Sequence, residues 1–257
     1  MLIQSHTRRL PFADSSIDHI YTDPPYLKKH LDCYLWLASE AARVLRPGGF
    51  LMAMLGGSYK NQVFRYFDDA GLDYFWDYSF LMGGSKTGIV WKNHPTDNPA
   101  GNKPIVVRTK SILIYSKGRA LPRTGTQDLI DVLDSGENWK QFHVWGQSVG
   151  VARYYLDCFT HEGQLICDPF IGGGSTALAC RIINRRFVGC DLDRSALLAS
   201  QNNLDGQVLP MPDGSMFAGV RINGYKEPLF DLIEMTRAGV PRRAGFFPQG
   251  DVPVSEE

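Results

Sequence analysis

An acidic residue, two prolines and a tyrosine follow one another at Asp23, Pro24, Pro25 and Tyr26, directly after a short apolar segment. The Asp23 carboxylate and the main-chain carbonyl of Pro24 are two acceptors that could hold both hydrogens of an aromatic amine. The prolines stiffen the turn, and the tyrosine ring offers a face on which an extruded nucleobase could stack. The residue types suit in-line attack of such an amine on an activated methyl group.

A second group of residues follows about 145 positions later. Asp168 ends an apolar segment, a glycine run at 172–174 forms a turn, and a helical pattern opens at Ser175 or Thr176. Asp191 ends the next apolar segment. A strand, a glycine turn, a helix, a strand and a terminal acid are typical of sites for adenosine-containing cofactors, since glycines admit the ligand and the acid accepts from ribose hydroxyls.

The glycine turn alone leaves several readings open. It fits a nicotinamide-dependent oxidoreductase, or a tight strand-to-helix turn without a ligand. A Walker-type phosphate loop is excluded because no lysine follows the last glycine. The oxidoreductase interpretation gives no role to the segment at Asp23–Tyr26.

The string Asp-Pro-Phe-Ile-Gly-Gly-Gly-Ser-Thr at 168–176 resembles the DPFxGxGxT segment with which DNA amino-methyltransferases bind S-adenosylmethionine. The segment at Asp23–Tyr26 resembles the catalytic turn of the same family. The resemblance implies that Asp168 faces the methionine ammonium and that Asp191 holds the ribose. The full set of implied cofactor contacts is Gln147, Ser148, Asp168, Pro169, Phe170, Gly172, Gly174, Ser175, Thr176 and Asp191.

The order of the two segments is reversed relative to most methyltransferases. The catalytic turn precedes the cofactor loop here, which resembles the beta group of DNA amino-methyltransferases, a circular permutation of the same sheet. The resemblance covers roughly residues 2–203. The run before the cofactor strand departs from that group, because 143–148 reads His-Val-Trp-Gly-Gln-Ser where the group has His-Pro-Thr-x-Lys-Pro.

Alternating apolar segments position these residues. Strands are expected at 17–22, 50–55, 74–81, 88–91, 106–116, 164–167 and 187–190, from apolar runs bounded by turn residues. Helices are expected at 31–45, 61–70, 149–159, 175–183 and 195–202, where apolar residues recur at helical spacing. Strands that alternate with helices favour a mostly parallel sheet covered on both faces.

The fold class is therefore α/β, and the resemblance implies a Rossmann-like methyltransferase with a mostly parallel seven-stranded sheet. An antiparallel hairpin is expected between 88–91 and 106–116. We expect a permuted methyltransferase domain at 1–204 and a C-terminal extension at 205–257. The segments 93–107 and 119–141 are candidate target-recognition insertions.

Double-stranded DNA is the expected partner, and its target base must be extruded to reach a buried methyl donor. Basic residues near the catalytic turn and the hairpin would contact phosphates, whereas the insertions would read bases. Both insertions are short, so the C-terminal tail or a second subunit of a homodimer would assist. The candidate phosphate contacts are Lys28, Lys29, Lys92, Lys103, Arg108, Lys110, Arg119 and Arg123.

Composition narrows the class of protein further. The 27 basic and 27 acidic residues balance, so net charge neither supports nor excludes a nucleic-acid partner. Five scattered cysteines suggest neither a zinc site nor a disulfide framework, and Cys167, Cys180 and Cys190 are expected to be buried thiols. With no apolar run long enough to span a bilayer, a cytoplasmic protein of a prokaryote or a phage-infected cell is expected.

The adenine N6 amine is the expected target, because the resemblance associates Asp in the first position with adenine enzymes. The alternative is the N4 amine of cytosine. Amine methylation in RNA or protein shares the chemistry, but there the turn generally reads Asn-Pro-Pro and follows the cofactor loop. A DNA-binding relative without catalytic activity is a further alternative.

Overall fold

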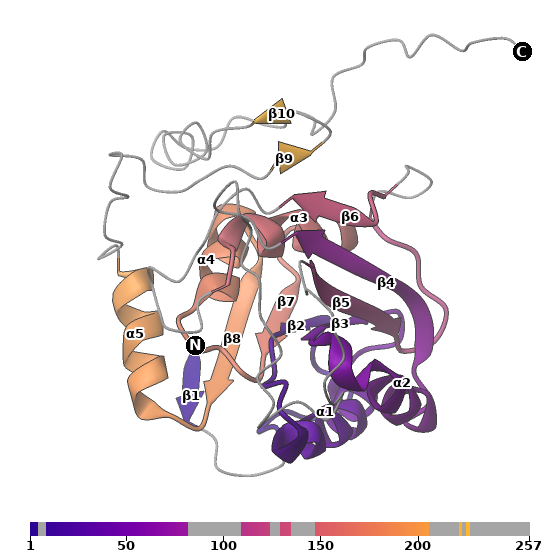
Figure 1. The fold of residues 1–257 in the computed structure, drawn as a ribbon. Helices are drawn as coiled ribbons and strands as arrows, with labels where there is room; N and C mark the ends of the chain where they lie inside the picture. The colour runs from indigo at the N-terminus through magenta and orange to yellow at the C-terminus, as the bar shows by residue number, and fades with distance from the viewer. Residues whose placement is uncertain are drawn as a thin grey trace, which may run out of the picture.

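The computed structural model describes residues 1–4, 9–81, 109–123, 129–134 and 147–205, together with the backbone of two short strands at 221–222 and 225–226. Its described strands form one sheet in the order β1-β8-β7-β2-β3-β5-β4-β6-β9-β10 (Figure 1). The strands are β1 (Leu2–Gln4), β2 (His19–Thr22), β3 (Phe50–Leu55), β4 (Asp73–Leu81), β5 (Thr109–Ser116), β6 (Val132–Asp134), β7 (Leu165–Asp168), β8 (Arg186–Asp191), β9 (Arg221–Ile222) and β10 (Tyr225–Lys226).

The central strands run parallel, as the sequence predicts. Strands β1, β8, β7, β2 and β3 pair in parallel from one neighbour to the next. Strand β5 then lies antiparallel between β3 and β4. Because parallel neighbours end at the same edge, the carboxyl ends of β2, β7 and β8 come together, which is where ligands bind in open α/β sheets.

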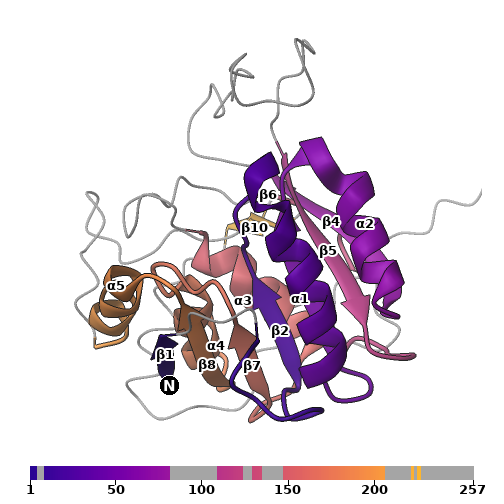
Figure 2. The same cartoon turned by 90° about the horizontal axis from the view of Figure 1, so that it is seen from below.

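Helices cover both faces of the sheet (Figures 1 and 2). Alternate residues of β3 show how the faces are divided. Phe50, Met52 and Met54 join the core cluster that contains the buried residues of α3 and α4, whereas Leu51, Ala53 and Leu55 join the one that contains those of α1 and α2. The helices are α1 (Leu31–Val44), α2 (Lys60–Asp69), α3 (Val149–Phe159), α4 (Ser175–Ile182) and α5 (Arg194–Leu204), with short 3-10 turns η1 (Lys28–His30) and η2 (Gly57–Tyr59).

The edges of the sheet differ from the prediction. Six of the seven expected strands form the described sheet together with four short strands that were not expected: β1 at one edge, and β6, β9 and β10 beyond β4 at the other. Strand β6 lies in the segment 119–141, where the sequence shows no period. Strand β1 was not expected either; its three residues pair with β8 at the opposite edge, and so short a strand leaves no periodic pattern.

The expected antiparallel hairpin has a different partner. Strand β5 pairs with β4 over the whole of Thr109–Ser116 and with β3 on its other side. The antiparallel pair therefore joins the strand predicted at 74–81 to the one predicted at 106–116. The strand predicted at 88–91 and the candidate insertion at 93–107 lie outside the described residues.

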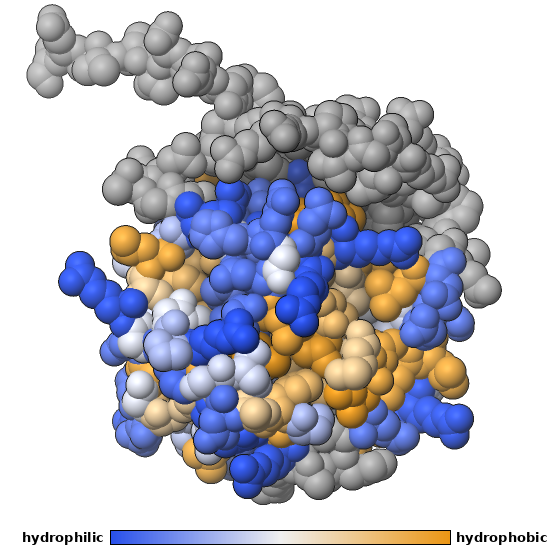
Figure 3. Space-filling view, turned by 180° about the vertical axis from the view of Figure 1, so that it is seen from behind, coloured by the Kyte–Doolittle hydropathy of each residue, from blue (hydrophilic) through white to orange (hydrophobic). Residues whose placement is uncertain are grey.

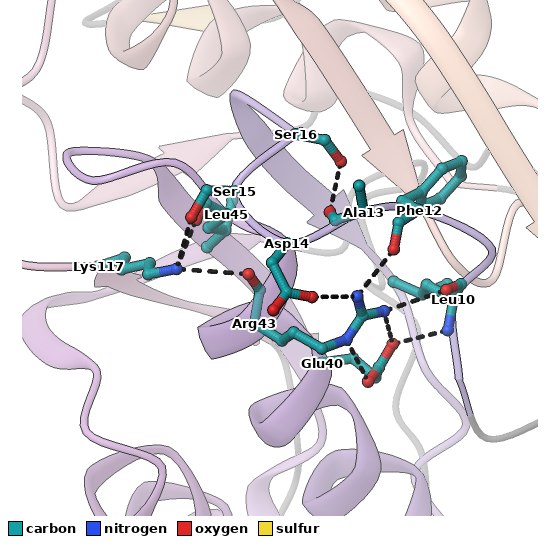
Figure 4. A network of polar contacts seen from close by, with 10 residues as sticks. All are labelled: Leu10, Phe12, Ala13, Asp14, Ser15, Ser16, Glu40, Arg43, Leu45 and Lys117. Carbon is teal, nitrogen blue, oxygen red and sulfur yellow. Dashed lines mark hydrogen bonds and ion pairs between the residues drawn. The ribbon is translucent and has the colours of Figure 1, made fainter.

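The loop before β2 is fastened to α1 by a network of polar contacts (Figure 4). The Arg43 guanidinium donates to the main-chain carbonyls of Leu10 and Phe12 and pairs with Glu40 and Asp14. The Leu10 N–H donates to Glu40 at 2.6 Å. This network fixes the entry of the chain into β2, and so the position at which β2 ends.

On the face shown in Figure 3, hydrophilic and hydrophobic side chains of the described residues are mixed. Among the described helices, none is long and apolar enough to cross a membrane. Cys167, Cys180 and Cys190 are buried free thiols, as the sequence predicts. Burial raises the pKa of Cys190 to about 12, which keeps this thiol protonated and unreactive.

Candidate functional site

Strands β2 and β7 bring the two sequence segments together. They are parallel neighbours, with Ile20 opposite Cys167, so the chain leaves both strands at one edge of the sheet. The Thr22 hydroxyl donates to Asp168 Oδ1 over 2.7 Å, although the two residues are 146 positions apart. Asp23 follows Thr22 directly, and the Pro-Pro turn therefore begins beside the start of the glycine loop.

Asp168 is the buried centre of this junction, with only 3% of its surface exposed. Its Oδ1 also accepts from the Phe170 N–H at 3.0 Å, and its Oδ2 accepts from the Thr176 hydroxyl at 2.6 Å. Burial raises the pKa of Asp168 to about 7, although these three donors oppose the rise. One carboxyl group thus joins β2, β7 and the first turn of α4.

The glycine loop has the backbone conformation that its sequence suggests. Gly172 and Gly174 have φ of 50° and 85°, the left-handed region that favours glycine. A Cβ at Gly174 would lie 3.0 Å from the Ser200 hydroxyl of α5. The Gly172 N–H donates to Asp191 Oδ2 at 3.0 Å, so the acid at the end of β8 is held against the loop.

Two aromatic rings meet beside this loop. Phe170 lies edge-on to Trp36 of α1, with ring centroids 5.7 Å apart. The Trp36 indole N–H is buried and has no hydrogen-bond partner among the described residues. This ring contact packs α1, which follows the Pro-Pro turn, against the segment that contains the glycine loop.

Asp23 has both carboxylate oxygens engaged. Its Oδ1 accepts from the Tyr26 hydroxyl, and its Oδ2 accepts from the Lys110 ammonium at 2.9 Å. The same ammonium lies 4.7 Å from the centre of the Tyr26 ring. Burial raises the pKa of Asp23, and the neighbouring Lys110 opposes that rise.

The Pro-Pro turn is buried on one side and exposed on the other. Pro24 is buried, whereas Pro25 is exposed. The Tyr34 hydroxyl donates to the Met54 carbonyl at 2.9 Å and lies 3.4 Å from the Pro24 carbonyl. The turn therefore presents a carboxylate, a carbonyl and an aromatic ring within four successive residues, an arrangement suited to holding an amine.

Comparison with known proteins decides which family this geometry belongs to. The family model described as DNA methylase, for N6 and N4 methyltransferases, matches residues 17–202, which include both segments. The chain belongs to this DNA methylase family. It is thus a DNA amino-methyltransferase, of the kind that acts on N6 of adenine or N4 of cytosine.

Two relatives of this DNA methylase match over most of their length. It is 27% identical over 218 residues to YubD of Escherichia coli (strain K12), named as a candidate methylase, covering 79% of this chain and 88% of the relative. It is 23% identical over 222 residues to the type II methyltransferase M.HpaI of Haemophilus parainfluenzae, covering 76% of this chain and 70% of the relative.

A solved structure supports the fold. The cytosine-N4-specific PvuII DNA methyltransferase superposes with a TM-score of 0.61 at 17% identity, over 74% of this chain and 80% of that one. An identity this low establishes the shared fold alone. The Rossmann-like methyltransferase fold predicted from the sequence is therefore confirmed for this DNA methylase.

The remaining predicted cofactor contacts of this methylase lie at the starts of α3 and α4 and next to Asp168. Ser175 and Thr176 form the first turn of α4, and Pro169 is buried beside Asp168. Ser148 caps α3, where its hydroxyl accepts from the Val151 N–H at 3.2 Å. Gln147 precedes it and is half-buried. Arg185, which precedes β8, donates to the hydroxyl of Thr160 at the far end of α3 at 3.0 Å. The start of α3, with Gln147 and Ser148, therefore lies toward the carboxyl ends of the strands.

The predicted phosphate contacts divide into four groups. Arg119 is exposed, and Arg123 forms an ion pair with Asp157 at 3.1 Å. Lys28 and Lys29 are exposed in η1, immediately after the Pro-Pro turn. Lys92, Lys103 and Arg108 lie outside the described residues. Lys110 differs from the expectation of a surface contact, because only 9% of its side chain is exposed and its ammonium pairs with Asp23.

Sequence reasoning missed three residues of the site. Thr22 bridges the two segments, Tyr34 lies against the Pro-Pro turn, and Trp36 packs on Phe170. Thr22 carried a signal, since a polar residue at the end of an apolar strand points to a polar partner there. Tyr34 and Trp36 followed the apolar pattern of α1 and gave no such signal.

Proposed function

We propose that this chain transfers a methyl group from S-adenosylmethionine to the N6 amine of adenine in double-stranded DNA. The observation that carries the proposal is the hydrogen bond between Thr22 and Asp168, which brings the amine-holding turn beside the cofactor loop. S-adenosylmethionine is the methyl donor, and it supplies a methyl carbon activated by a positive sulfonium.

The residues at the ends of β7 and β8 fit this donor. The ligand carries a positive ammonium and a positive sulfonium, so its binding site requires hydrogen-bond acceptors. An ionised carboxylate offers about four acceptor positions, and Asp168 uses three of them, which leaves room for the ammonium. Asp191 accepts two backbone N–H groups and keeps positions for ribose hydroxyls. Gly172 and Gly174 let the loop backbone approach the ligand, and Phe170 packs beside it.

The other residues proposed to contact S-adenosylmethionine lie in the glycine loop or at the starts of α3 and α4. Pro169 stiffens the loop, while Ser175 and Thr176 begin the helix beneath the ligand. Gln147 and Ser148 face the methionine carboxylate. The Ser148 hydroxyl caps α3 and retains its own hydrogen to donate.

The Pro-Pro turn holds the amine. The lone pair of an aromatic amine is delocalised into the ring, so the nitrogen attacks well only when both hydrogens are held out of the way. Asp23 and the Pro24 carbonyl accept those two hydrogens and aim the lone pair at the methyl carbon. Pro25 fixes the turn, and the Tyr26 ring stacks on the base. After transfer the nitrogen carries an extra proton, which Asp23 is placed to accept.

Adenine is favoured over cytosine by the residue at position 23. Asp in the first position of this turn resembles the adenine enzymes of the family, and Ser the cytosine ones. The order of the segments likewise supports assignment to the permuted beta group. Cytosine N4 is the alternative product of the same geometry.

DNA reaches the site at the exposed side of the turn. Lys28 and Lys29 are exposed two and three positions after Tyr26, where they contact backbone phosphates and fix the register of the duplex. Residues 93–107 and 119–141 supply base recognition, with help from 205–257 or from a second subunit. The chain at 1–204 forms the methyltransferase domain.

The experiment is methyl transfer onto a DNA library from S-adenosylmethionine that carries a labelled methyl group, followed by nucleoside analysis. The parent chain is compared with Asp23→Ala. Asp69→Ala is the matched control, because Asp69 is an exposed carboxylate at the far end of α2.

The expected product is labelled N6-methyldeoxyadenosine from the parent and from Asp69→Ala. Asp23→Ala should lose a factor of about 10²–10³ in rate, the usual loss when a preorganised polar group at the reacting centre is removed. Label in N4-methyldeoxycytidine would show that the target is the N4 amine of cytosine, the alternative named above. Label found only in RNA or protein would overturn the proposal.

A further inference from the structure

Lys110 is a charged residue in a place where an unpaired charge would be costly. It is the second residue of β5, and its side chain is 9% exposed. Burial lowers the pKa of Lys110, and the neighbouring Asp23 opposes that fall. Removing one partner of a buried ion pair leaves the other charge uncompensated, so Lys110 and Asp23 depend on each other.

The contacts of Lys110 are the groups that the proposed mechanism uses. Its ammonium donates to Asp23 Oδ2 at 2.9 Å and lies over the Tyr26 ring, 4.7 Å from its centre. The Tyr26 hydroxyl in turn donates to Asp23 Oδ1. The three side chains form a closed triangle, in which Lys110 fixes both the acceptor and the stacking ring.

Asp23 faces several other titratable groups. Asp168 lies on the neighbouring strand; burial raises the pKa of Asp168, and the nearby Asp23 carboxylate raises it further. The Tyr21 and Tyr34 hydroxyls, from β2 and α1, have pKa values raised well above normal by burial and by Asp23, so both stay neutral. Within the described part of the chain, Lys110 is the cation that pairs with Asp23.

These contacts make the ionisation of Asp23 depend on one cation. A carboxyl group in a buried site beside a second carboxyl group tends to keep its proton. A protonated Asp23 would accept the amine hydrogen less strongly than a carboxylate. An adjacent ammonium reverses this tendency, and each carboxylate oxygen keeps a second lone pair for the incoming amine.

We propose that Lys110 is a positioning residue for methyl transfer, whose ammonium keeps Asp23 an ionised, correctly oriented acceptor and steadies the Tyr26 ring. This inference rests on the proposed function for the role of the amine. The control of Asp23 ionisation by Lys110 can be measured without turnover. Lys110 acts through Asp23 and Tyr26, not on the methyl donor.

The test compares the parent with Lys110→Met, which keeps the length of the side chain without its charge, and with Lys110→Arg, which keeps the charge. Proteins labelled with ¹³C at the aspartate carboxyl carbons are titrated by NMR from pH 5 to 9. The Asp23 signal is assigned by its loss in Asp23→Asn. Single-turnover methylation of DNA is measured over the same pH range. Lys110→Gln replaces Lys110→Met if the latter does not fold.

The Asp23 pKa should rise by about 1–3 in Lys110→Met, the effect expected of losing an adjacent opposite charge, and stay near the parent value in Lys110→Arg. The methylation rate of Lys110→Met should fall most at low pH and approach the parent rate as pH rises. An unchanged Asp23 titration, or a rate lowered by one factor at every pH, would overturn the inference.

The two proposals fail in different ways. If the parent transfers no methyl group to DNA, the proposed function fails, while the NMR titration still reports whether Lys110 controls Asp23. If the parent is active but Lys110→Met titrates and reacts like the parent, only the role of Lys110 fails.

Discussion

The Thr22 hydroxyl and the Asp168 carboxylate are joined by a buried 2.7 Å hydrogen bond that links two distant parts of the chain. One residue beyond Thr22 is the carboxylate proposed to hold the target amine, and beyond Asp168 lies the loop proposed to hold the methyl donor. A change at either residue should therefore affect both halves of the site.

Replacing Thr22 by Val removes this bond while keeping the shape of the side chain. Thr22 is fully buried, and Asp168 would lose one of its donors. The free energy of unfolding should fall by about 1–3 kcal/mol, the net contribution of one hydrogen bond to a buried carboxyl group, since Asp168 keeps its bonds from Phe170 and Thr176. Urea denaturation measures the effect. Thr109→Val, at an exposed position of β5, should change stability by less than about 0.5 kcal/mol; equal effects would contradict the role of Thr22.

Asp168 should make the stability of the protein fall as pH rises. Its pKa is about 7 when folded, against an ordinary value of 3.8. Between these values the folded state holds a proton that the unfolded state has released, so rising pH favours unfolding. At 1.36 kcal/mol per pKa unit, the loss from Asp168 is of the order of 4 kcal/mol between pH 4 and 8.

Asn at position 168 cannot ionise and should remove this loss. The difference in unfolding free energy between Asp168→Asn and the parent should shift in favour of the variant as pH increases from 4 to 8. Denaturation at several pH values measures that difference. A difference that is constant across the range would show that Asp168 does not carry a raised pKa.

Gly174 should resist replacement by alanine for a reason of backbone geometry. An L-residue at its φ of 85° is strained by roughly 1–2 kcal/mol, and the added Cβ would lie 3.0 Å from Ser200. Gly174→Ala should lower both stability and S-adenosylmethionine affinity, as measured by denaturation and calorimetry. Gly57→Ala is the control, because a Cβ there meets nothing within 4 Å; a Gly174→Ala protein that binds the donor like Gly57→Ala would contradict the assignment.

Two substitutions separate the role of the Tyr26 ring from the role of its hydroxyl. Tyr26→Ala should weaken binding of the extruded base by about 5- to 150-fold, because stacking contributes about 1–3 kcal/mol per base. Tyr26→Phe keeps the ring and loses only the bond to Asp23, so it should stay close to the parent. Fluorescence of 2-aminopurine at the target position reports base extrusion. If Tyr26→Phe is impaired as much as Tyr26→Ala, the ring is not a stacking surface.

Local patterns predicted much of the fold and both segments of the site. The helix expected at 149–159 is α3, Val149–Phe159, and the one expected at 31–45 is α1, Leu31–Val44. Each has a continuous apolar stripe and a clear end. The Pro-Pro turn and the glycine loop were found because their chemistry requires unusual residues within a few positions.

Contacts between distant segments could not be predicted in the same way. Lys110 resembles a solvated charge at the start of a strand, and only the folded sheet reveals a partner 87 positions away. Strand β6 is three residues long and forms because β4 offers a free edge, a cause that lies outside its own sequence. The partner of β5 was misjudged for the same reason.

The most direct test of the account is a crystal structure of the chain with S-adenosylmethionine or an unreactive analogue and a DNA duplex containing the target. The account predicts a donor beside Asp168 and Asp191 and an extruded adenine on Tyr26. Its N6 should lie about 3–3.5 Å from the reacting carbon, with its hydrogens on Asp23 and the Pro24 carbonyl. A donor bound elsewhere, or a base whose amine points away from Asp23, would contradict it.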